Sequence, residues 1–373
     1  MQNAMDLARK AVGLASPNPL VGCVIVNNGE IVGQGFYEYD GRSHAEVLAL
    51  RAAGEKSRGA TMYVTLEPHN HTGRTPPCTE AIISAGITRV VAAMQDPNPE
   101  VAGSGFERLR AAGLEVHCGL LAEQARALNE AFTCWILTKG PFVTLKSALT
   151  LDGQLAWPQP KTKSAKTLAN KSTAAWFTSE ESRTEVHCMR HASDALLTGI
   201  GTIVADNPLL TDRSGSPRRR RLLRVILDTT LRLTPDARIV KTLDDDLLVV
   251  TSTPLTIPRA RKLQDAGVEL FRVRPSRTGR AGIDLHAVLA ELGRRNILSV
   301  MLEAGPTLNG AALTADVIHK LVLFYAPKIA GSGAVPFAKA SNLVPAALGN
   351  LGVRQIGRDV VMEGYLKNVY RNH

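Results

Sequence analysis

Side chains that suit a catalytic metal recur along the first part of the chain. His44 is followed two residues later by Glu46. A later segment carries His69, His71 and Cys78. Zinc in a catalytic site takes three nitrogen, oxygen or sulfur ligands and keeps a fourth position open for water. A nearby carboxylate can accept a proton from that water and pass it to a leaving amine. This pattern indicates a zinc-dependent deaminase, whose signature pairs His-x-Glu with a Pro-Cys segment.

A segment in the second half of the chain suits a bound phosphate. Residues 302–310 read Leu-Glu-Ala-Gly-Pro-Thr-Leu-Asn-Gly, between a predicted strand and a predicted helix. The N-terminus of such a helix offers free backbone N–H groups and the positive end of the helix dipole to a pyrophosphate. Residues 199–204 approach a dinucleotide-binding fingerprint but lack its third glycine, so we do not expect a Rossmann domain.

The charge of the chain points to an anionic partner. The formal net charge is +10 at pH 7, which favours either nucleic acid or a phosphorylated small molecule. The densest basic run, four arginines at 218–221, lies just before a predicted strand. Arginines at such a junction are more typical of a solvated edge than of a nucleic-acid site. We therefore expect a phosphorylated small molecule and no nucleic acid.

Length and composition favour two globular domains. A chain of 373 residues with 45% hydrophobic residues is too long for one ordinary core. It holds no apolar run near the roughly 20 residues of a membrane helix, so we expect no membrane association. Its first residues lack the features of a secretory signal, and its five cysteines are an odd number, unlike a disulfide framework. These features favour the cytoplasm.

Alternating helices and strands must position these groups, which indicates an α/β fold. In the first half we predict helices at 1–15, 45–53, 79–86 and 105–112, and strands at 21–26, 31–36, 61–66, 90–93 and 114–117. Residues 27–30, Asn-Asn-Gly-Glu, are typical of a hairpin turn. After a break at 139–141 we predict strands at 143–148, 195–198, 224–227, 247–251, 298–303 and 320–325. Residues 157–173 are polar and aperiodic, which predicts a mobile loop.

Several motifs together resemble one family, the bifunctional deaminase/reductases of riboflavin biosynthesis. In the first half the similar segments are residues 17–22, 44–47, 73–78 and 96–103. In the second half they are residues 146–153, 194–199 and 206–211. The resemblance implies an N-terminal cytidine-deaminase-like three-layer domain at 1–140. It also implies a C-terminal dihydrofolate-reductase-like domain at 141–373.

The resemblance also implies the site residues. Zinc would be held by His44, His69 and Cys78, with Glu46 as the general acid/base. The implied substrate contacts of the deaminase half are Asn18, His71, Arg74, Thr75, Asp96 and Asn98. The implied NADPH contacts are Leu149, Trp176, Thr202, Asp206, Thr229, Gly305, Pro306, Thr307, Leu308, Asn309, Gly310 and Ala311. The implied substrate contacts of the reductase half are Arg190, Leu210, Arg213 and Glu303.

This chain departs from the family pattern at the metal. The family has cysteine where this chain has His69, so the ligands become two imidazoles and one thiolate. The net charge of the site rises by one unit, which should acidify a bound water further. We expect a working but altered site; a degraded metal site with an inactive deaminase half is the alternative. His71, which matches a family histidine that assists the substrate, is the fallback ligand, and we favour His69.

Three further departures concern the substrate. Tyr37 stands where the family usually carries histidine, and Ala174 stands where serine is common. The stretch between Gly153 and Trp176 is longer than usual. The first two bear on individual substrate contacts and the third on the behaviour of a lid, and the expected hydride path is left intact.

The expected reaction has two steps. Hydrolytic deamination of 2,5-diamino-6-(5-phosphoribosylamino)pyrimidin-4-one is followed by NADPH-dependent reduction of the ribosyl group to ribityl. An RNA-base (tRNA) deaminase with an accessory domain would also explain the charge. Such enzymes close the zinc site with Cys-x-x-Cys, whereas eight residues separate His69 from Cys78 here. A zinc-stabilised scaffold without catalysis is a third reading. Members of the family associate, so we expect a homodimer or a higher homo-oligomer.

Overall fold

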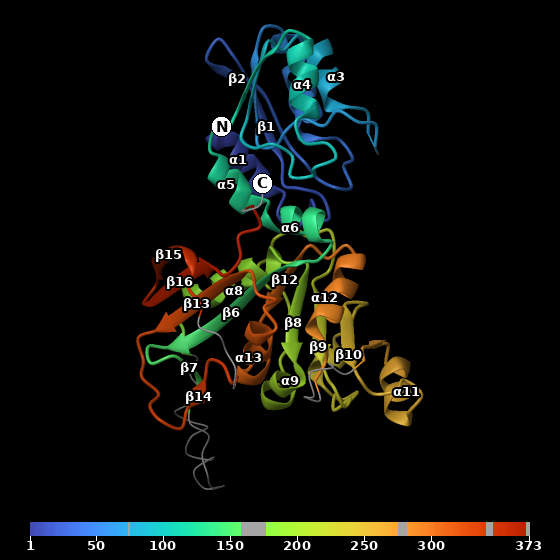
Figure 1. Cartoon of the computed structure of the whole chain (residues 1–373), viewed down its shortest axis with the longest axis vertical. Helices are drawn as coiled ribbons and strands as arrows, with labels where there is room; N and C mark the ends of the chain where they lie inside the picture. Colours follow the sequence, from blue (N-terminus) through green and yellow to red (C-terminus); the bar gives the residue numbers. More distant parts are fainter. Residues whose placement is uncertain (74, 158–176, 275–281, 341–345, 371–373) are drawn as a thin grey trace. The chain divides into compact units, whose positions relative to one another are not determined.

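The chain forms two compact units (Figure 1). The computed structural model describes residues 1–73, 75–157, 177–274, 282–340 and 346–370. Unit 1 comprises Met1–Lys139 together with Pro217–Arg220, and unit 2 comprises Gly140–Ser216 and Arg221–His373. Most of the predicted mobile loop, the part from residue 158 onward, lies outside the described residues.

Unit 1 is built on a five-stranded sheet with the order β2-β1-β3-β4-β5. Its strands are β1 (Gly22–Asn27), β2 (Glu30–Phe36), β3 (Thr61–Val64), β4 (Arg89–Ala92) and β5 (Glu115–Cys118). Strand β1 is antiparallel to both β2 and β3, whereas β3, β4 and β5 are parallel. The carboxyl ends of β3 and β4 therefore meet at one edge of the sheet, where α/β proteins commonly place their sites.

Helices cover both faces of this sheet. They are α1 (Gln2–Lys10), α2 (Ala45–Ala53), α3 (Cys78–Ser84), α4 (Ser104–Ala111), α5 (Ala122–Leu128) and α6 (Glu130–Thr138). Helix α1 packs Ala4 and Leu7 against Val24, on one face. Helix α2 contacts β2 on the other face, so closely that a Cβ on Gly33 would lie 2.2 Å from the Ala49 carbonyl oxygen. The predicted three-layer arrangement of this half is confirmed.

Unit 2 is built on a nine-stranded sheet with the order β11-β10-β9-β8-β12-β6-β13-β16-β15. Its strands are β6 (Phe142–Thr150), β8 (Ala195–Gly199), β9 (Leu223–Leu227), β10 (Leu247–Thr251), β11 (Glu269–Arg272), β12 (Ser299–Leu302), β13 (Lys320–Ala326), β15 (Gly349–Ile356) and β16 (Asp359–Tyr365). The first seven strands in this order are parallel to one another. Strands β16 and β15 form an antiparallel hairpin that extends one edge of the sheet. A small second sheet pairs β7 (Gln154–Ala156) with β14 (Val335–Pro336).

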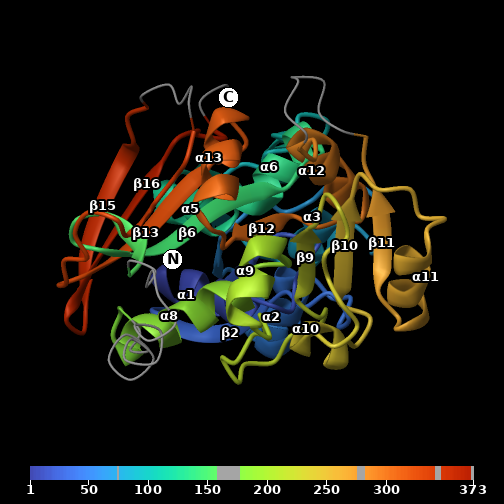
Figure 2. The same ribbon diagram turned by 90° about the horizontal axis from the view of Figure 1, so that it is seen from below.

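Alternating side chains of these strands pack into two hydrophobic cores, one on each face of the sheet. Leu197, Val225 and Leu248 face α12 (Leu285–Arg294) and α13 (Pro306–Thr314). Their neighbours Leu196, Ile226 and Val249 face the opposite layer. That layer holds α8 (Glu180–His191), α9 (Ile200–Asp206), α10 (Arg238–Lys241) and α11 (Pro258–Asp265) (Figure 2). Both faces of the parallel strands are thus covered, as expected for a mainly parallel sheet.

Some predicted elements differ from the observed ones. The first helix ends at Lys10 rather than at residue 15, because Gly13 adopts a φ of +78° in a turn that a helix cannot continue. The β15–β16 hairpin was not predicted. In the part of the chain that the structure describes, no helix combines the length and the apolar character needed to cross a membrane.

The arginine run at 218–221 is not simply a solvated edge. The guanidinium of Arg219 lies 3.7 Å from the centroid of the Tyr39 ring and 2.9 Å from Asp40. Its Nη1 also donates to the Ser16 carbonyl oxygen at 2.9 Å. The prediction missed this because the partners lie far away in the sequence. Arg221 does remain more than half exposed.

Unit 2 should lose stability in mild acid through His319. The Nδ1 atom of this imidazole accepts a hydrogen bond from the backbone N–H of Val143 at 3.1 Å, which requires an unprotonated nitrogen. Burial, helped by the nearby Lys367, lowers the pKa of His319 to about 4. As the pH falls, His319 therefore becomes protonated in the unfolded chain at a higher pH than in the folded one. Stability is fully present above pH ~6.5 and falls by on the order of 3 kcal/mol as the pH approaches 4.

The measurement is the free energy of unfolding of unit 2 as a function of pH. In His319→Gln, whose side chain does not titrate, the slope between pH 6.5 and 4 should be shallower than in the wild type. Equal slopes in the two proteins would exclude His319 as the titrating group.

Candidate functional site

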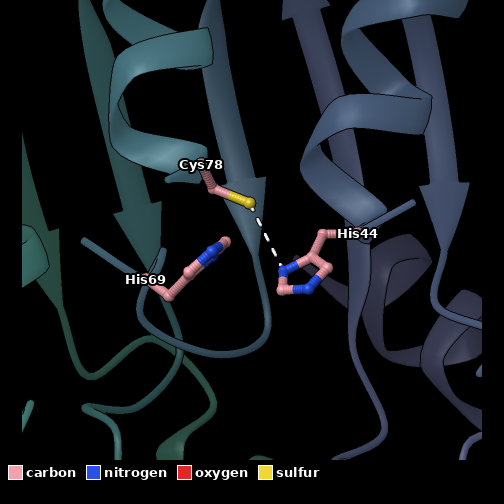
Figure 3. Close-up of side chains that lie close together, drawn as sticks. All are labelled: His44, His69 and Cys78. Atoms are coloured by element: carbon pink, nitrogen blue, oxygen red, sulfur yellow. Dashed lines mark hydrogen bonds between the residues drawn. The ribbon is translucent and has the colours of Figure 1, made fainter. Parts of the chain in front are cut away.

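The predicted metal ligands lie together in unit 1. His44 is the N-cap residue of α2, His69 follows the end of β3, and Cys78 is the first residue of α3. One ligand atom from each lies within 4.8 Å of the others (Figure 3). The Cys78 Sγ is 3.5 Å from the His44 Nδ1, and the rings of His44 and His69 have centroids 4.4 Å apart. Two helix beginnings and one strand end thus converge on a single point.

The donor set fits a zinc ion. Tetrahedral geometry with a Zn–S bond of about 2.3 Å and a Zn–N bond of about 2.0 Å puts sulfur and nitrogen about 3.5 Å apart, as observed. The Nδ1 atom of His69 is buried without a hydrogen-bond partner, which is rare for a polar atom unless it serves a ligand. Burial, together with the neighbouring His44, lowers the pKa of His69 to about 4, so the imidazole is in the neutral form that binds metals.

The surroundings of the ligands also suit a metal centre. The Thr75 Oγ1 lies 3.2 Å from the Nε2 of His44, the nitrogen that faces away from Cys78. Such an outer contact fixes the ring orientation of a ligating histidine. Thr75 was expected among the substrate contacts, and this geometry gives it a second role. His71 is exposed, and its ring centroid is 5.3 Å from that of His69, outside the ligand group.

Glu46 lies on the first turn of α2 beside the ligand group. Its side chain is buried, and burial raises the pKa of the carboxyl despite the opposing effect of His44. The carboxyl also forms a hydrogen bond with the Cys78 thiol. A carboxyl group with a raised pKa, held beside a metal site, is suited to take up and release a proton.

A pocket of about 260 Å³ opens onto these residues. Of the predicted substrate contacts, it is lined by Asn18, His71, Thr75, Asp96 and Asn98. The Nδ2 of Asn18 lies 2.7 Å from the hydroxyl of Tyr37, the residue that replaces the family's histidine. Arg74 lies outside the described residues.

Asp96 and Asn98 shape a turn as well as lining the pocket. Asp96 accepts a hydrogen bond from the backbone N–H of Asn98 at 2.8 Å, and Asn98 accepts one from that of Glu100 at 3.2 Å. Burial raises the pKa of Asp96. Each of these two side chains therefore uses one oxygen for the turn.

In unit 2, a buried ionic cluster lies at the carboxyl ends of the central strands. Arg190 on α8 donates to both oxygens of Glu303, from Nε at 2.7 Å and from Nη2 at 3.0 Å. The Lys146 Nζ on β6 lies 3.8 Å from the same carboxylate. Burial alone would raise the pKa of Glu303, but the charges of Lys146 and Arg190 outweigh it and lower that pKa. Arg190 and Glu303 were predicted as substrate contacts; here they bind one another.

Lys146 is a member of this buried ionic cluster that the sequence did not single out. Burial lowers the pKa of its ammonium group, and its neighbours along β6 are mainly apolar. A lysine inside an otherwise apolar strand was the available signal, because lysine is almost never fully buried without a partner. The partner, Glu303, could not be identified from sequence spacing.

The predicted NADPH contacts of unit 2 fall into two groups. Gly305 is the N-cap residue of α13 and Pro306 is its first residue; a Cβ on Gly305 would meet no other atom of the described residues within 4 Å. Asn309 is instead fully buried, with its Nδ2 donating to the Phe337 carbonyl oxygen at 2.9 Å, and Gly310 packs against Lys339. The side chain of Leu149 is also buried.

The remaining predicted contacts of unit 2 are more dispersed. Thr202 and Asp206 lie on α9, and burial raises the pKa of Asp206. The backbone carbonyl of Thr229 accepts hydrogen bonds from the hydroxyls of the residues that end β10 and follow it, Thr251, Ser252 and Thr253. Leu210 is buried at a φ of +56°, and Arg213 is exposed. Trp176 lies outside the described residues.

Comparison with known proteins covers both halves of the chain. Residues 1–94 match the family model of the cytidine and deoxycytidylate deaminase zinc-binding region, and residues 141–362 match that of the RibD C-terminal domain. The riboflavin biosynthesis protein RibD of Aquifex aeolicus is 41% identical over 95% of this chain and 90% of its own length. RibD of Escherichia coli is also 41% identical, over 90% and 88% of the two chains.

Solved structures agree with the sequence matches. Acinetobacter baumannii RibD superposes with a TM-score of 0.82 at 35% identity, covering 98% of this chain and 97% of the other. The Thermotoga maritima diaminohydroxyphosphoribosylaminopyrimidine deaminase/5-amino-6-(5-phosphoribosylamino)uracil reductase superposes with a TM-score of 0.80 at 35% identity, with the same coverage. Because these matches span both units, an RNA-base deaminase with an accessory domain is not favoured. The chain belongs to the RibD family of riboflavin biosynthesis proteins, with a zinc-binding deaminase half and a reductase half of the NADPH-dependent type.

Proposed function

We propose that this enzyme converts 2,5-diamino-6-(5-phosphoribosylamino)pyrimidin-4-one to 5-amino-6-(5-phosphoribitylamino)uracil. The first half removes the 2-amino group and the second half reduces the sugar. The observation that carries the proposal is the group of His44, His69 and Cys78 beside the buried Glu46, in a chain that resembles RibD over both halves.

For the deamination, we assign the metal to His44, His69 and Cys78 and proton transfer to Glu46. Zinc bound there would supply Lewis acidity that makes a water molecule nucleophilic at neutral pH. Glu46 accepts a proton as that water attacks the carbon bearing the amino group. It then donates the proton to the nitrogen as the C–N bond breaks and ammonia leaves. Asn18 orients the pyrimidine, and the polar groups of the 96–98 turn hold the ribose phosphate.

For the reduction, NADPH would supply a hydride and the protein orients the sugar. The bond between C1 and the ring oxygen breaks, a C–H bond forms at C1, and one proton goes to the ring oxygen, which becomes a hydroxyl. We assign cofactor contacts to the start of α13 and to Thr202, Asp206 and Thr229. Arg213 donates to the hydroxyl of Thr211, whose carbonyl oxygen accepts from Arg190. It is suited to a phosphate oxygen because guanidinium offers paired donors.

The test combines metal analysis with separate assays of the two steps on the purified full-length protein. Bound zinc, ammonia release and NADPH oxidation by the deaminated intermediate are all expected. The presence of His69 in place of the family's cysteine favours one alternative, a reductase with an inactive deaminase half. NADPH oxidation without ammonia release, in protein that contains zinc, would establish that alternative.

Replacing Glu303 with glutamine should weaken both the stability and the reductase activity of unit 2. The change leaves Arg190 and Lys146 buried without their counter-charge, and breaking a buried ion pair costs about 3–5 kcal/mol. We expect a lower denaturant midpoint for unit 2 and slower NADPH oxidation. Ammonia release should be unchanged, since Glu303 belongs to unit 2. An unaltered midpoint would contradict the strength assigned to this pair.

We assign the deaminase to residues 1–140 and the reductase to residues 141–373, and propose a homodimer or higher homo-oligomer in the cytoplasm. The odd number of cysteines supports a reducing compartment. Light scattering during size-exclusion chromatography measures the oligomeric state. A monomer at micromolar concentration would contradict the proposed association.

A further inference from the structure

One buried carboxylate holds both ends of the loop that carries Asp96 and Asn98. Glu67 lies just beyond β3 and is 4% exposed. Its Oε2 accepts hydrogen bonds from the backbone N–H of Asp96 at 3.1 Å and from that of Gly103 at 3.0 Å. Asp96 opens the loop and Gly103 closes it. A single oxygen therefore sets the distance between the two ends.

The other oxygen of Glu67 completes the beginning of α4. Gly103 is the N-cap residue of this helix and has no side chain to cap it. The Oε1 of Glu67 accepts hydrogen bonds from the backbone N–H of Gly105 at 2.9 Å and from that of Phe106 at 3.4 Å. Free N–H groups at a helix start need acceptors, and negative charge there is favourable. Glu67 supplies from another element the cap that Gly103 lacks.

The loop is built to approach this carboxylate closely. A Cβ on Gly105 would lie 2.0 Å from the Pro68 carbonyl oxygen, so only glycine allows the observed contact. Gly103 adopts a φ of +84°, which favours glycine. Both glycines are thus explained by one requirement, the close approach of the loop to Glu67.

Capping alone does not account for the position of Glu67. A cap for α4 needs to reach only the backbone N–H groups at the start of that helix, such as those of Gly105 and Phe106. The carboxylate instead joins the helix start to Asp96, whose own Oδ1 accepts from the backbone N–H of Asn98. Asp96, Asn98 and Glu67 all line the pocket that also holds His44. The hydrogen-bond chain therefore runs from a buried anchor to the pocket wall.

We propose that Glu67 is a positioning residue of the deaminase site, which holds Asp96 and Asn98 where the substrate's ribose phosphate binds. The inference rests on the proposed function of the first half. Glu67 itself touches the loop backbone, so it acts on substrate binding through Asp96 and Asn98. Loosening the anchor should weaken binding more than it slows the chemical step.

The test is Glu67→Gln, which keeps the size of the side chain but replaces one of its two acceptor oxygens with an NH2 group that cannot accept from the backbone N–H donors. The KM for deamination should rise by about 10- to 100-fold, since small misplacements of binding groups have effects of this size. The kcat should change less than about threefold, and zinc content and NADPH oxidation should be unchanged. The matched control is Glu80→Gln. Glu80 contacts α4 from the surface, through Arg108 at 2.7 Å and 3.1 Å, and does not line the pocket.

Hydrogen exchange gives a readout that does not depend on activity. The amides of residues 96–106 should exchange faster in Glu67→Gln than in the wild type, and remain slow in Glu80→Gln. If Glu67→Gln does not fold, Gly105→Ala disturbs the same seating without changing a charge and should raise the KM in the same way.

Two outcomes would count against the role of Glu67, and a third would count against the proposed function of the first half. Unchanged exchange of residues 96–106 would overturn the role of Glu67 as an anchor. Faster exchange with an unchanged KM would leave it a purely structural residue. Absence of ammonia release from the wild type itself would instead count against the proposed function of the first half, while the exchange experiment would still decide whether Glu67 anchors the loop.

Discussion

Glu46→Gln should lower the rate of ammonia release by about 10²–10⁴-fold while zinc remains bound, because general acid/base catalysis contributes on this scale. Glutamine has the shape of glutamate but cannot carry the proton between water and the leaving amine. Glu46 is buried beside the ligand group, so bulk solvent has little access to take its place. The measurement is kcat for ammonia release together with zinc content by elemental analysis.

The controls separate a catalytic effect from loss of the site. Glu55→Gln changes an exposed carboxylate of the same unit, 91% exposed, and should leave ammonia release unaffected. NADPH oxidation with the deaminated intermediate should be equal in both variants. Full ammonia release by Glu46→Gln would mean that zinc is structural and that this carboxylate shuttles no proton.

Cys78→Ala should release zinc and abolish ammonia release, whereas NADPH oxidation persists. The variant removes the only sulfur of the ligand group and leaves two imidazoles. Loss of an outer contact alone can lower metal affinity by about 10- to 100-fold, so loss of a ligand should exceed about 100-fold. Competition with a chelator measures the affinity, and the two activity assays report on each half separately.

Two further variants test which histidine completes the site. His69→Cys restores the ligand type of the family and should retain zinc and ammonia release. His71→Asn changes the exposed neighbour, whose ring lies outside the ligand group, and should retain zinc as well. Loss of zinc from His71→Asn, with zinc retained in His69→Asn, would exchange the roles of the two histidines.

Local structure was well determined by the sequence. Helix α2 spans Ala45–Ala53 as predicted, and the hairpin between β1 and β2 turns at Asn28 and Gly29, which adopt φ values of +50° and +84°. These features depend on neighbouring residues, whose spacing and conformational preferences can be read directly. The two-part α/β architecture followed in the same way, from the alternation of apolar runs and turn signals.

Motifs also identified the chemistry, because a metal site needs specific donors. His44, Glu46 and Cys78 stand in segments whose residue types resemble a known family, so their nomination required no coordinates. His69 was favoured over His71, and the structure groups His69 with His44 and Cys78. Residues two apart in an extended segment point to the same face, so local alternation does not distinguish the two histidines; the path of the chain around the site does.

Long-range pairing was decided only by the tertiary structure. Arg190 and Glu303 lie 113 residues apart and form two hydrogen bonds with each other, and Lys146 approaches the same carboxylate from another strand. Glu67 accepts hydrogen bonds from four backbone N–H groups, and these belong to a loop and a helix that follow β4. Such contacts depend on strand order and on the packing of layers, which bring distant segments together only when the whole core forms. The residue types therefore show which chemistry is available to the protein. The packing of the sheets determines which charged side chains come into contact.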